Sequence, residues 1–252
     1  MLFKGILQGL GYLCYTTAAR INFDWDMASP PKFCGMGHTV NIVLPIDGPD
    51  GTAPVPHVVD VGYGGHGDIS MLYRPLPLID GTVVSSFTPP EEHRLLRATR
   101  PDDECALAES GWVLQVRVAP SEPWRLSYWI NLAEFTETDW EWINFSMSKL
   151  PTAPMYNMLV CIKLHELPTG EIARTSIWSA RAVRKVGAKK EVLERWEWEE
   201  ERIDGISRLC GMKLDMREAI AGAREKPGMA LPIREDAQLD GRCDAINTSL
   251  LN

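Results

Sequence analysis

The sequence predicts an α+β protein in which an antiparallel barrel or curved sheet is followed by a smaller unit of strands and helices. Three observations lead to this prediction. Short runs of alternating or β-branched residues, separated by turn signals, indicate several strands between residues 12 and 131. A helical pattern over residues 136–149 ends before two prolines. Beyond it, strand and helix patterns resume as far as residue 210.

The composition is that of an ordinary globular protein. The 252 residues are 45% hydrophobic and 24% charged, which leaves room for one large domain or two modest ones. The net charge of −8 and the pI of about 5.2 argue against nucleic acid as a partner, because nucleic acid would require a basic face. This charge balance fits a small neutral or cationic substrate, or a cofactor held by backbone groups.

The six cysteines are scattered singly along the chain. Since they form neither a C-x-x-C pair nor a Cys/His knuckle, we expect no metal. Single cysteines without a signal peptide indicate a reducing, cytoplasmic location. No apolar run approaches the length of a membrane span, so we expect no membrane partner. The cysteines are Cys14, Cys34, Cys105, Cys161, Cys210 and Cys243.

The first predicted elements are a helix and a strand. Apolar residues at helical spacing predict a helix over residues 1–13, and Gly11 suits its C-terminal cap. The apolar face begins at position 2 without an N-cap, so we expect that the chain starts partway through a helix and that a segment upstream is missing. Residues 12–21 suit a strand, and a polar loop containing proline follows over residues 22–32.

The remaining elements follow from the same two periodicities. A helix over residues 199–210 ends at Gly211, and the acidic run at residues 196–201 is interpreted as its solvated start. Residues from about Arg224 onward are polar and weakly periodic, which predicts a loosely packed tail. Strands are predicted at residues 37–44, 57–61, 83–87, 94–98, 112–118, 125–131, 158–165, 172–183 and 190–195.

A long-loop hairpin formed by residues 37–44 and 57–61 carries the first candidate site residues. If the register sum of the antiparallel pair is even, His38 and Asp60 lie on the same face, and a directly opposite placement brings their Cβ atoms to roughly 5 Å. The carboxylate then accepts from one ring nitrogen and leaves the other available, which is the base and orienting half of a nucleophile–His–acid site. The alternative is an ordinary hydrogen-bonded pair, or two rim residues, without a catalytic role.

The glycines after the second hairpin strand match a dinucleotide-binding pattern. Gly62, Gly64 and Gly67 have the spacing G-x-G-x-x-G, and Asp80 lies near the distance expected of the acidic partner. The pattern requires a helix directly after it, whereas residues 68–78 contain two prolines and no amphipathic run. We therefore set aside a nicotinamide oxidoreductase as a third hypothesis. The glycines either turn the chain sharply or let the backbone approach a ligand.

Two strings in this hairpin resemble a known family. Gly-Met-Gly-His at residues 35–38, followed by an apolar strand, and Val-Asp-Val-Gly-Tyr-Gly at residues 59–64 resemble the arylamine N-acetyltransferases, and are most similar to fungal-type members. The helical start also matches, since Leu-Phe at residues 2–3, Leu-Gly-Tyr at 10–12 and Ala-Arg-Ile at 19–21 are similar to the segment just downstream of the family's nucleophile. Residues 155–163 resemble the passage from the interdomain helix into the lid. The resemblance covers roughly residues 1–215.

The resemblance implies a fold similar to that of cysteine proteases, with an N-terminal helical bundle, a β-barrel and an α/β lid. It implies a ping-pong reaction in which a Cys thiolate takes acetyl from acetyl-CoA and passes it to a small-molecule arylamine or arylhydrazine. Acetyl-CoA would be the co-substrate, His38 the base, and Asp60 its orienting residue. Tyr63 would line the acceptor pocket, and Cys34 and Gly35 would lie against CoA. An imidazole held by a carboxylate lowers the pKa of a neighbouring thiol, which makes this chemistry sound.

The chain departs from the family pattern at the nucleophile. The family places this cysteine in Arg-Gly-Gly-x-Cys, and this string does not occur in the 252 residues. Cys34 is four residues before His38, which is about 13 Å in extended chain, so only a sharp fold-back at Gly35 or Gly37 would bring the thiol to the ring. Cys14 sits among apolar strand residues, where a buried and inert thiol is expected.

These observations lead to a prediction for each part of the chain. We expect a remnant of the helical domain at residues 1–13, a β-barrel with His38 and Asp60 at 14–135, an interdomain helix at 136–152, an α/β lid at 153–222 and a flexible tail at 223–252. The chain is predicted to be an arylamine N-acetyltransferase homologue that is inactive as given because it lacks the nucleophile. The alternative is a protein that binds CoA or an aromatic ligand without chemistry.

Overall fold

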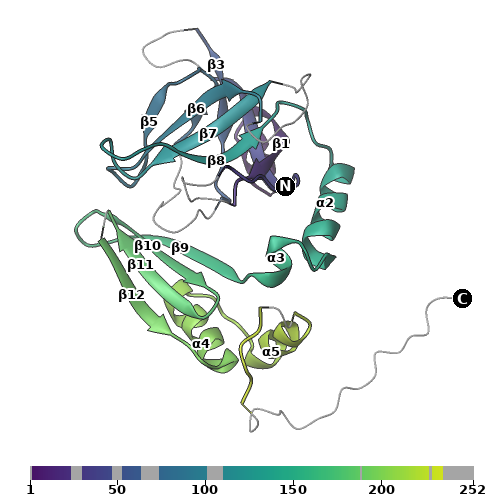
Figure 1. Ribbon diagram of the computed structural model, residues 1–252, viewed down its shortest axis with the longest axis vertical. Helices are drawn as coiled ribbons and strands as arrows, with labels where there is room; N and C mark the ends of the chain where they lie inside the picture. The colour runs from purple at the N-terminus through teal and green to yellow at the C-terminus, as the bar shows by residue number, and fades with distance from the viewer. Residues whose placement is uncertain are drawn as a thin grey trace, which may run out of the picture.

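The computed structural model describes residues 2–23, 30–46, 53–63, 74–100, 110–187, 189–226 and 229–234. Within these ranges it consists of an eight-stranded sheet, a four-stranded sheet and five helices. In Figure 1 the larger sheet occupies the upper half and the smaller sheet lies below it, with α2 joining the two at one side. The fold is therefore α+β, as the sequence predicts.

The eight-stranded sheet is nearly closed into a barrel. Its strand order is β4-β3-β2-β1-β8-β7-β6-β5, and β4 contacts β6 across the opening. Each neighbouring pair of strands described is antiparallel, which is incompatible with the parallel sheet that a dinucleotide-binding fold requires. The strands are β1 (Leu13–Ile21), β2 (His38–Ile46), β3 (Val55–Val59), β4 (Leu76–Pro77), β5 (Val83–Ser85), β6 (Glu92–Ala98), β7 (Gly111–Arg117) and β8 (Arg125–Ile130).

Alternating apolar residues fill the inside of this barrel. Val40 and Ile42 of β2 are 0% and 1% exposed, and they pack with Leu95 and Leu114 from the far side of the barrel. Since successive side chains of a strand point to opposite faces, His38 continues the inward row that Val40 and Ile42 begin. The barrel core therefore fixes the direction in which the histidine points.

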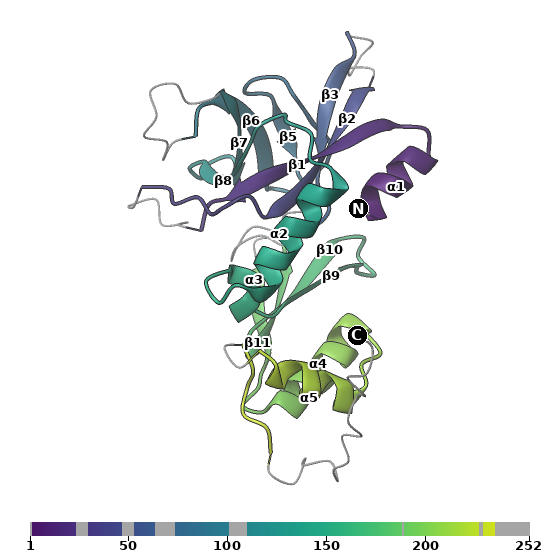
Figure 2. The same ribbon diagram turned by 90° about the vertical axis from the view of Figure 1, so that its right-hand side faces the viewer.

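Two helices flank the barrel. Helix α1 (Leu2–Gly9) ends where Gly11 adopts a φ of +91°, a left-handed conformation typical of helix C-termini, as the sequence predicts. Helix α2 (Glu137–Lys149) begins after Thr136, whose backbone N–H and hydroxyl both donate to the Asp139 carboxylate at 2.7 Å. The indole of Trp140 donates to the Thr16 hydroxyl of β1 at 2.9 Å, which ties α2 to the barrel wall. Figure 2 shows α2 leading from the barrel to α3 (Pro154–Asn157).

The smaller sheet has the order β12-β11-β10-β9 and is antiparallel. The predicted single strand at residues 172–183 is wrong, because it divides into two strands at a tight turn in which Ser179 has a φ of +51°. On one face, Ile177 and Ala182 pack against Trp196, which follows β12, and against Ile206 of α4. The elements are β9 (Val160–Glu166), β10 (Ile172–Trp178), β11 (Arg181–Val186), β12 (Lys189–Arg195), α4 (Glu199–Cys210) and α5 (Met216–Arg224).

A buried ion pair corrects two further expectations. Glu199, expected in a solvated helix start, is 2% exposed and pairs with Arg202, which is fully buried. The Arg202 guanidinium also donates to the carbonyl of Met229 at 3.0 Å, and the Leu231 N–H donates to Glu199 at 2.8 Å. A loose tail from residue 223 is therefore wrong for residues 229–234, because their backbone groups satisfy this buried pair. Residues 235–252 lie outside the described ranges.

No helix in the described part of the chain has both the length and the apolar character that crossing a membrane would require.

Candidate active site

The His38–Asp60 pair stands at the end of the barrel core. Strands β2 and β3 pair Asn41 with Val59 and Ile42 with Val58, so the register sum is even and the two side chains share a face, as expected. Continuing this register places Asp60 opposite Val40, so the pair is diagonal across the strands rather than directly opposite. The diagonal suits the two side chains, and the Nε2 atom of His38 lies 2.6 Å from the Oδ2 atom of Asp60.

A glycine lies beside this diagonal contact. Gly62 falls opposite His38 in the same register, and a Cβ atom there would lie 3.8 Å from the Cε1 atom of His38 and 4.0 Å from the Oδ1 atom of Asp60. A Cβ atom at residue 62 would therefore be in ordinary van der Waals contact with both members of the pair. The first glycine of the G-x-G-x-x-G string thus lies beside the ring, while residues 64–73 lie outside the described ranges.

The Asp60 carboxylate is held by both of its oxygens. The Oδ1 atom accepts the backbone N–H groups of Gly62 at 3.0 Å and of Tyr63 at 3.2 Å, which leaves Oδ2 facing the ring of His38. The Asp60 side chain is 2% exposed and that of His38 is 12% exposed. Because an ionised carboxylate only accepts, the Nε2 atom of neutral His38 carries the proton and donates, and Nδ1 carries the lone pair. Among the described residues, no hydrogen bond occupies Nδ1.

Two tyrosine rings enclose the histidine. The ring of Tyr63 lies 5.2 Å from that of His38, the ring of Tyr128 lies 5.8 Å from it, and the two tyrosines meet edge to face at 5.4 Å. Burial raises the pKa of both hydroxyls well above the usual range of tyrosine, so the rings stay neutral at physiological pH. Tyr63 was predicted from the resemblance, whereas Tyr128 was missed. Residues 127–130 of β8 are buried on both faces, so alternation gives no sign of which side chain meets His38.

Cys34 and Gly35 lie in the segment that leads into β2. The Cys34 thiol donates to the Gly35 carbonyl at 3.0 Å and accepts from the backbone N–H of Ile21 at 3.3 Å. Burial raises the pKa of this thiol above the ordinary cysteine value, although hydrogen bonds from the backbone of Ile21 and of Cys34 itself, and the charge of Arg20, oppose the shift. A thiol with a raised pKa that is bound to its own backbone is a poor nucleophile.

The other described cysteines stand apart from the histidine. The Cys14 thiol donates to the Lys4 carbonyl beside α1, and Cys161 and Cys210 lie 3.3 Å apart in the smaller unit. Among the described residues, no cysteine thiol hydrogen-bonds to His38. In the same ranges, no three His, Cys, Asp or Glu side chains gather as a metal-binding group. Cys105 and Cys243 lie outside the described residues.

Two cavities lie where α2 faces the beginning of β2. One, of about 520 Å³, is lined by Gly37, Thr39 and one face of α2 that includes Trp140 and Met147. The other, of about 460 Å³, is lined by Cys34, Gly35 and the end of α2, and Met147 borders it too. Gly37 allows this approach, because a Cβ atom there would lie 3.0 Å from the sulfur of Met147. The predicted CoA-contacting residues therefore do border a cavity, next in sequence to the histidine.

The geometry defines a proton-accepting site. A carboxylate fixes one ring nitrogen of His38, neutral aromatic rings enclose the imidazole, and neighbouring residues line two cavities, one bordered by Cys34 and Gly35 and the other by Gly37 and Thr39. Such an imidazole can take a proton from a thiol or an amine that reaches Nδ1. A nearly closed antiparallel barrel that carries a His–Asp pair, with an α/β unit beside it, is the arrangement that the resemblance implies.

Solved structures share this fold. The arylamine N-acetyltransferase from Salmonella typhimurium is 19% identical with a TM-score of 0.62, covering 87% of this chain and 71% of that one. The enzyme from Mycobacterium smegmatis is 21% identical with a TM-score of 0.65, covering 91% and 71%. The Mycobacterium marinum enzyme, solved in complex with CoA, is 23% identical with a TM-score of 0.60, covering 90% and 72%.

The family follows from the sequence comparison. A family model described as N-acetyltransferase matches residues 1–193, and the chain belongs to this family, the arylamine N-acetyltransferases. Among curated proteins, no match is found. The recognition made from residues 35–38 and 59–64 is therefore confirmed at the level of the family and of the fold.

Proposed function

We propose that His38 and Asp60 form the base and orienting pair for acetyl transfer from acetyl-CoA to an arylamine or arylhydrazine through a cysteine thiol. The observation that carries this proposal is the 2.6 Å contact between Nε2 and Oδ2, with Nδ1 left to accept a proton. The membership in the arylamine N-acetyltransferase family supports the reaction class. The CoA complex of the Mycobacterium marinum relative supports acetyl-CoA as the donor.

The reaction proceeds in two transfers. In the first, Nδ1 of His38 takes the thiol proton, the thiolate attacks the acetyl carbonyl carbon, and the bond to the CoA sulfur breaks, so CoA leaves as a thiol with the proton from His38. In the second, the amine nitrogen attacks the acetyl thioester, the carbon–sulfur bond breaks, and the amine proton returns through His38 to the cysteine sulfur. Asp60 keeps the ring in the required tautomer and stabilises the imidazolium in both steps.

None of the described residues places a cysteine thiol next to His38. Cys34 is bound to its own backbone, and Cys14, Cys161 and Cys210 have their thiols elsewhere. We therefore propose that these 252 residues bind the substrates but do not turn them over. Tyr63 would form part of the acceptor side of the pocket, and Cys34 and Gly35 would border the CoA side, where the cavity of about 460 Å³ lies.

Chemical rescue with a small thiol tests the proposal. A diffusible thiol such as 2-mercaptoethanol can be deprotonated by His38 and take the acetyl group from acetyl-CoA, and the released CoA is measured by chromatography. General base catalysis contributes about 10²-fold or more when the groups are well placed, so a freely diffusing thiol should show at least about a tenfold acceleration over the His38→Gln variant. Equal rates for wild type and His38→Gln would refute the catalytic role of His38.

A second candidate function is a protein that binds CoA or an aromatic ligand without chemistry. The backbone contacts of the Cys34 thiol favour it, since they leave the cavity beside Cys34 without a reactive group from that residue. Calorimetry with CoA, combined with the small-thiol rescue assay, distinguishes the acetyltransferase from the binding protein. Saturable CoA binding without rescue supports the binding protein, and rescue that depends on His38 supports the transferase.

A further inference from the structure

Three sulfur atoms meet in the smaller unit, at the end of α4. The Sγ atom of Cys161 in β9 lies 3.3 Å from the Sγ atom of Cys210 and 3.7 Å from the Sδ atom of Met212. The two cysteines are 49 residues apart, so no local motif marks them, and both are free thiols. The acetyl transfer proposed for His38 uses neither thiol. We call Cys161, Cys210 and Met212 the sulfur cluster.

A glycine turn brings two of these sulfurs to the third. Gly211 follows Cys210, the last residue of α4, and its φ of +71° is a left-handed conformation that glycine adopts readily. The chain changes direction there, so Cys210 and Met212 both reach the Sγ atom of Cys161. The carbonyl groups at the C-terminal end of a helix carry partial negative charge, so this end of α4 favours a cation.

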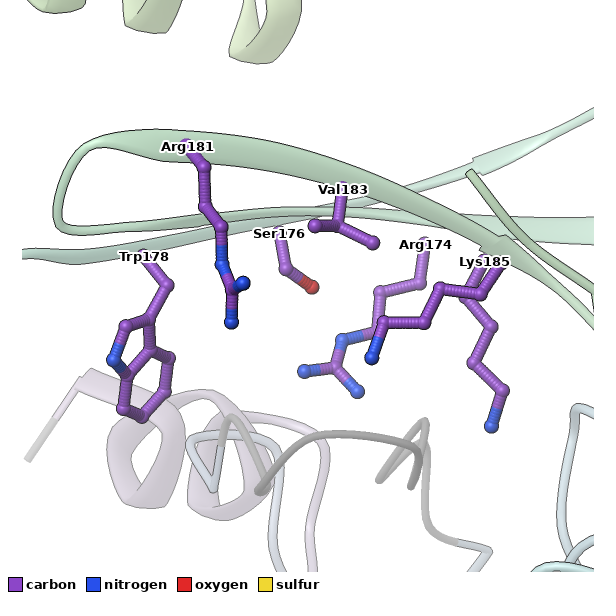
Figure 3. A pocket seen from close by; sticks show the side chains of 7 residues that line it. Arg174, Ser176, Trp178, Arg181, Val183 and Lys185 are labelled. Atoms are coloured by element: carbon purple, nitrogen blue, oxygen red, sulfur yellow. The ribbon is translucent and has the colours of Figure 1, made fainter. Parts of the chain in front are cut away.

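The sulfur cluster lies on the face of the smaller sheet that packs against α4. Cys161 is directly opposite Ile177 of β10, so both side chains point toward that helix. Figure 3 shows Ser176 and Trp178 of the same strand extending from the other face. The two thiols are half-buried against the apolar packing around Ile177, whereas Met212 is 45% exposed, so an ion can reach the cluster from solvent.

The spacing of the three sulfurs fits a metal ion between them. A metal–sulfur bond of about 2.3 Å places the three sulfurs of a planar site about 4 Å apart. The observed separations of 3.3 Å and 3.7 Å are slightly shorter. Small rotations of the flexible Met212 side chain and of the two cysteine side chains would therefore open the cluster around an ion without a change of the backbone.

Charge and ligand type select the ion. Thiolate and thioether sulfurs are soft ligands, which favour Cu(I). Two thiolates and one neutral thioether leave a Cu(I) complex with one negative charge. The ammonium of Lys163 balances that charge, because it lies 3.3 Å from the position that a Cβ atom of Gly211 would occupy. Zn(II) instead prefers four ligands, and the described residues contain no group of three His, Cys, Asp or Glu side chains that could hold it.

We propose that the sulfur cluster binds one Cu(I) ion. Binding replaces the thiol protons of Cys161 and Cys210, which pass to the solvent, while copper and sulfur keep their oxidation states. Burial and the neighbouring Cys161 thiol raise the pKa of Cys210 to about 12, so this exchange requires an ion as thiophilic as Cu(I). None of the three ligands belongs to the His38–Asp60 site, so this inference goes beyond the proposed function and does not depend on it.

A Cu(I) titration of the reduced, complete 252-residue chain in an anaerobic buffer tests the site, with a chromogenic Cu(I) chelator as the competitor. We expect one ion to pass from the chelator to the chain. Loss of an outer-shell group at a metal site typically costs about 10–100-fold in affinity, so Cys161→Ser, which removes a ligand, should weaken binding by at least about 100-fold. Cys14→Ser removes a thiol outside the cluster and should retain the tight site. Circular dichroism confirms that each variant is folded.

The third ligand has a closely matched control. Met212→Leu keeps the size of the side chain and should weaken Cu(I) binding about tenfold, because a neutral thioether contributes less than a thiolate. Met155→Leu should leave the affinity unchanged, since both methionines are 45% exposed and Met155 lies in α3. Copper X-ray absorption should show three sulfur neighbours in the wild type and two in Met212→Leu.

The contrary results are equally specific. A reduced wild type that withdraws no ion from the chelator would overturn the copper site, and a disulfide between Cys161 and Cys210 formed in air would then identify them as a redox pair. Equal affinities in Cys161→Ser and Cys14→Ser, or in Met212→Leu and Met155→Leu, would also overturn it. The thiol rescue and CoA binding test the proposed function alone, so a failure of one proposal is distinguishable from a failure of the other.

Discussion

Replacing Asp60 by asparagine should reverse the tautomer of His38. The carboxylate accepts two backbone N–H groups at Oδ1 and faces the imidazole with Oδ2. An asparagine amide must direct its oxygen either to the two backbone donors or to the ring. Because two donors outweigh one, the oxygen stays on Gly62 and Tyr63, and the NH₂ group faces Nε2. That nitrogen must then accept, and the proton of His38 moves to Nδ1.

The cost in stability follows from the same contacts. A hydrogen bond to a charged group contributes about 1.5–3 kcal/mol to stability, and a hydrogen bond between neutral groups contributes about 0.5–1.5 kcal/mol. Asp60→Asn also removes the free-energy cost of burying a charged carboxylate. We expect a net loss of about 1–2 kcal/mol for Asp60→Asn. Asp60→Ala instead leaves the buried donors of Gly62, Tyr63 and His38 without their acceptor, at about 1–3 kcal/mol for each group, so it should cost about 3–9 kcal/mol.

Nitrogen-15 NMR of the histidine rings is the direct assay, and it requires no turnover. When the imidazole of His38 is neutral, its proton should lie on Nε2 in the wild type and on Nδ1 in the Asp60→Asn variant. Thermal unfolding should show that Asp60→Asn melts about 5 °C lower and remains folded. The reasoning is refuted if the wild type carries the proton on Nδ1, or if Asp60→Asn keeps it on Nε2. Thiol rescue should then be lost in Asp60→Asn, since Nδ1 no longer has a lone pair to offer.

Three further predictions concern other groups. Burial raises the pKa of Cys34, so iodoacetamide should modify it more slowly at pH 8 than it modifies the urea-unfolded chain; equal rates would contradict its burial. Hydrogen bonds from Thr136 lower the pKa of Asp139 in the folded protein. The ionised Asp139 carboxylate therefore stabilises the folded state fully above the usual aspartate pKa of about 3.9, and this contribution is lost as the pH falls through the lowered pKa of the folded protein. Asp139→Asn should therefore lower the unfolding free energy at pH 7 and leave it unchanged near pH 2, as measured by denaturant unfolding. Helix α1 exposes Leu2 and Ile6, so the chain should associate in gel filtration, and Ile6→Glu should reduce this association; a wild-type monomer would refute the point.

The sequence predicts most of the barrel because its strands obey a simple period. Val40 and Ile42 alternate with polar residues, so the inward face and the position of His38 on it could be inferred before the structure. The string around Asp60 identifies the family, and an even register sum correctly places both side chains on one face. Helix α2 was predicted to within a residue, since its capping residue Thr136 and the prolines after it are local signals.

The remaining features depend on contacts between distant segments. The diagonal placement of His38 and Asp60 is set by the exact register of β2 and β3, which the long connecting loop does not determine. Tyr128 meets His38 because β8 and β2 both pair with β1, a neighbourhood that no local pattern reveals. Helix α5 and the two-residue strand β4 were also missed, the latter because a proline is seldom assigned to a strand.

The most direct test of the account is an acetyl-transfer assay of the 252-residue chain with acetyl-CoA and an arylamine in the absence of any added thiol. The account places a base and its orienting carboxylate beside a site that no described cysteine thiol reaches. It therefore predicts neither acetyl-CoA hydrolysis nor arylamine acetylation above background. Measurable turnover that disappears in His38→Ala would contradict this result, and would mean that a cysteine of this chain, with Cys34 nearest in sequence, reaches the imidazole.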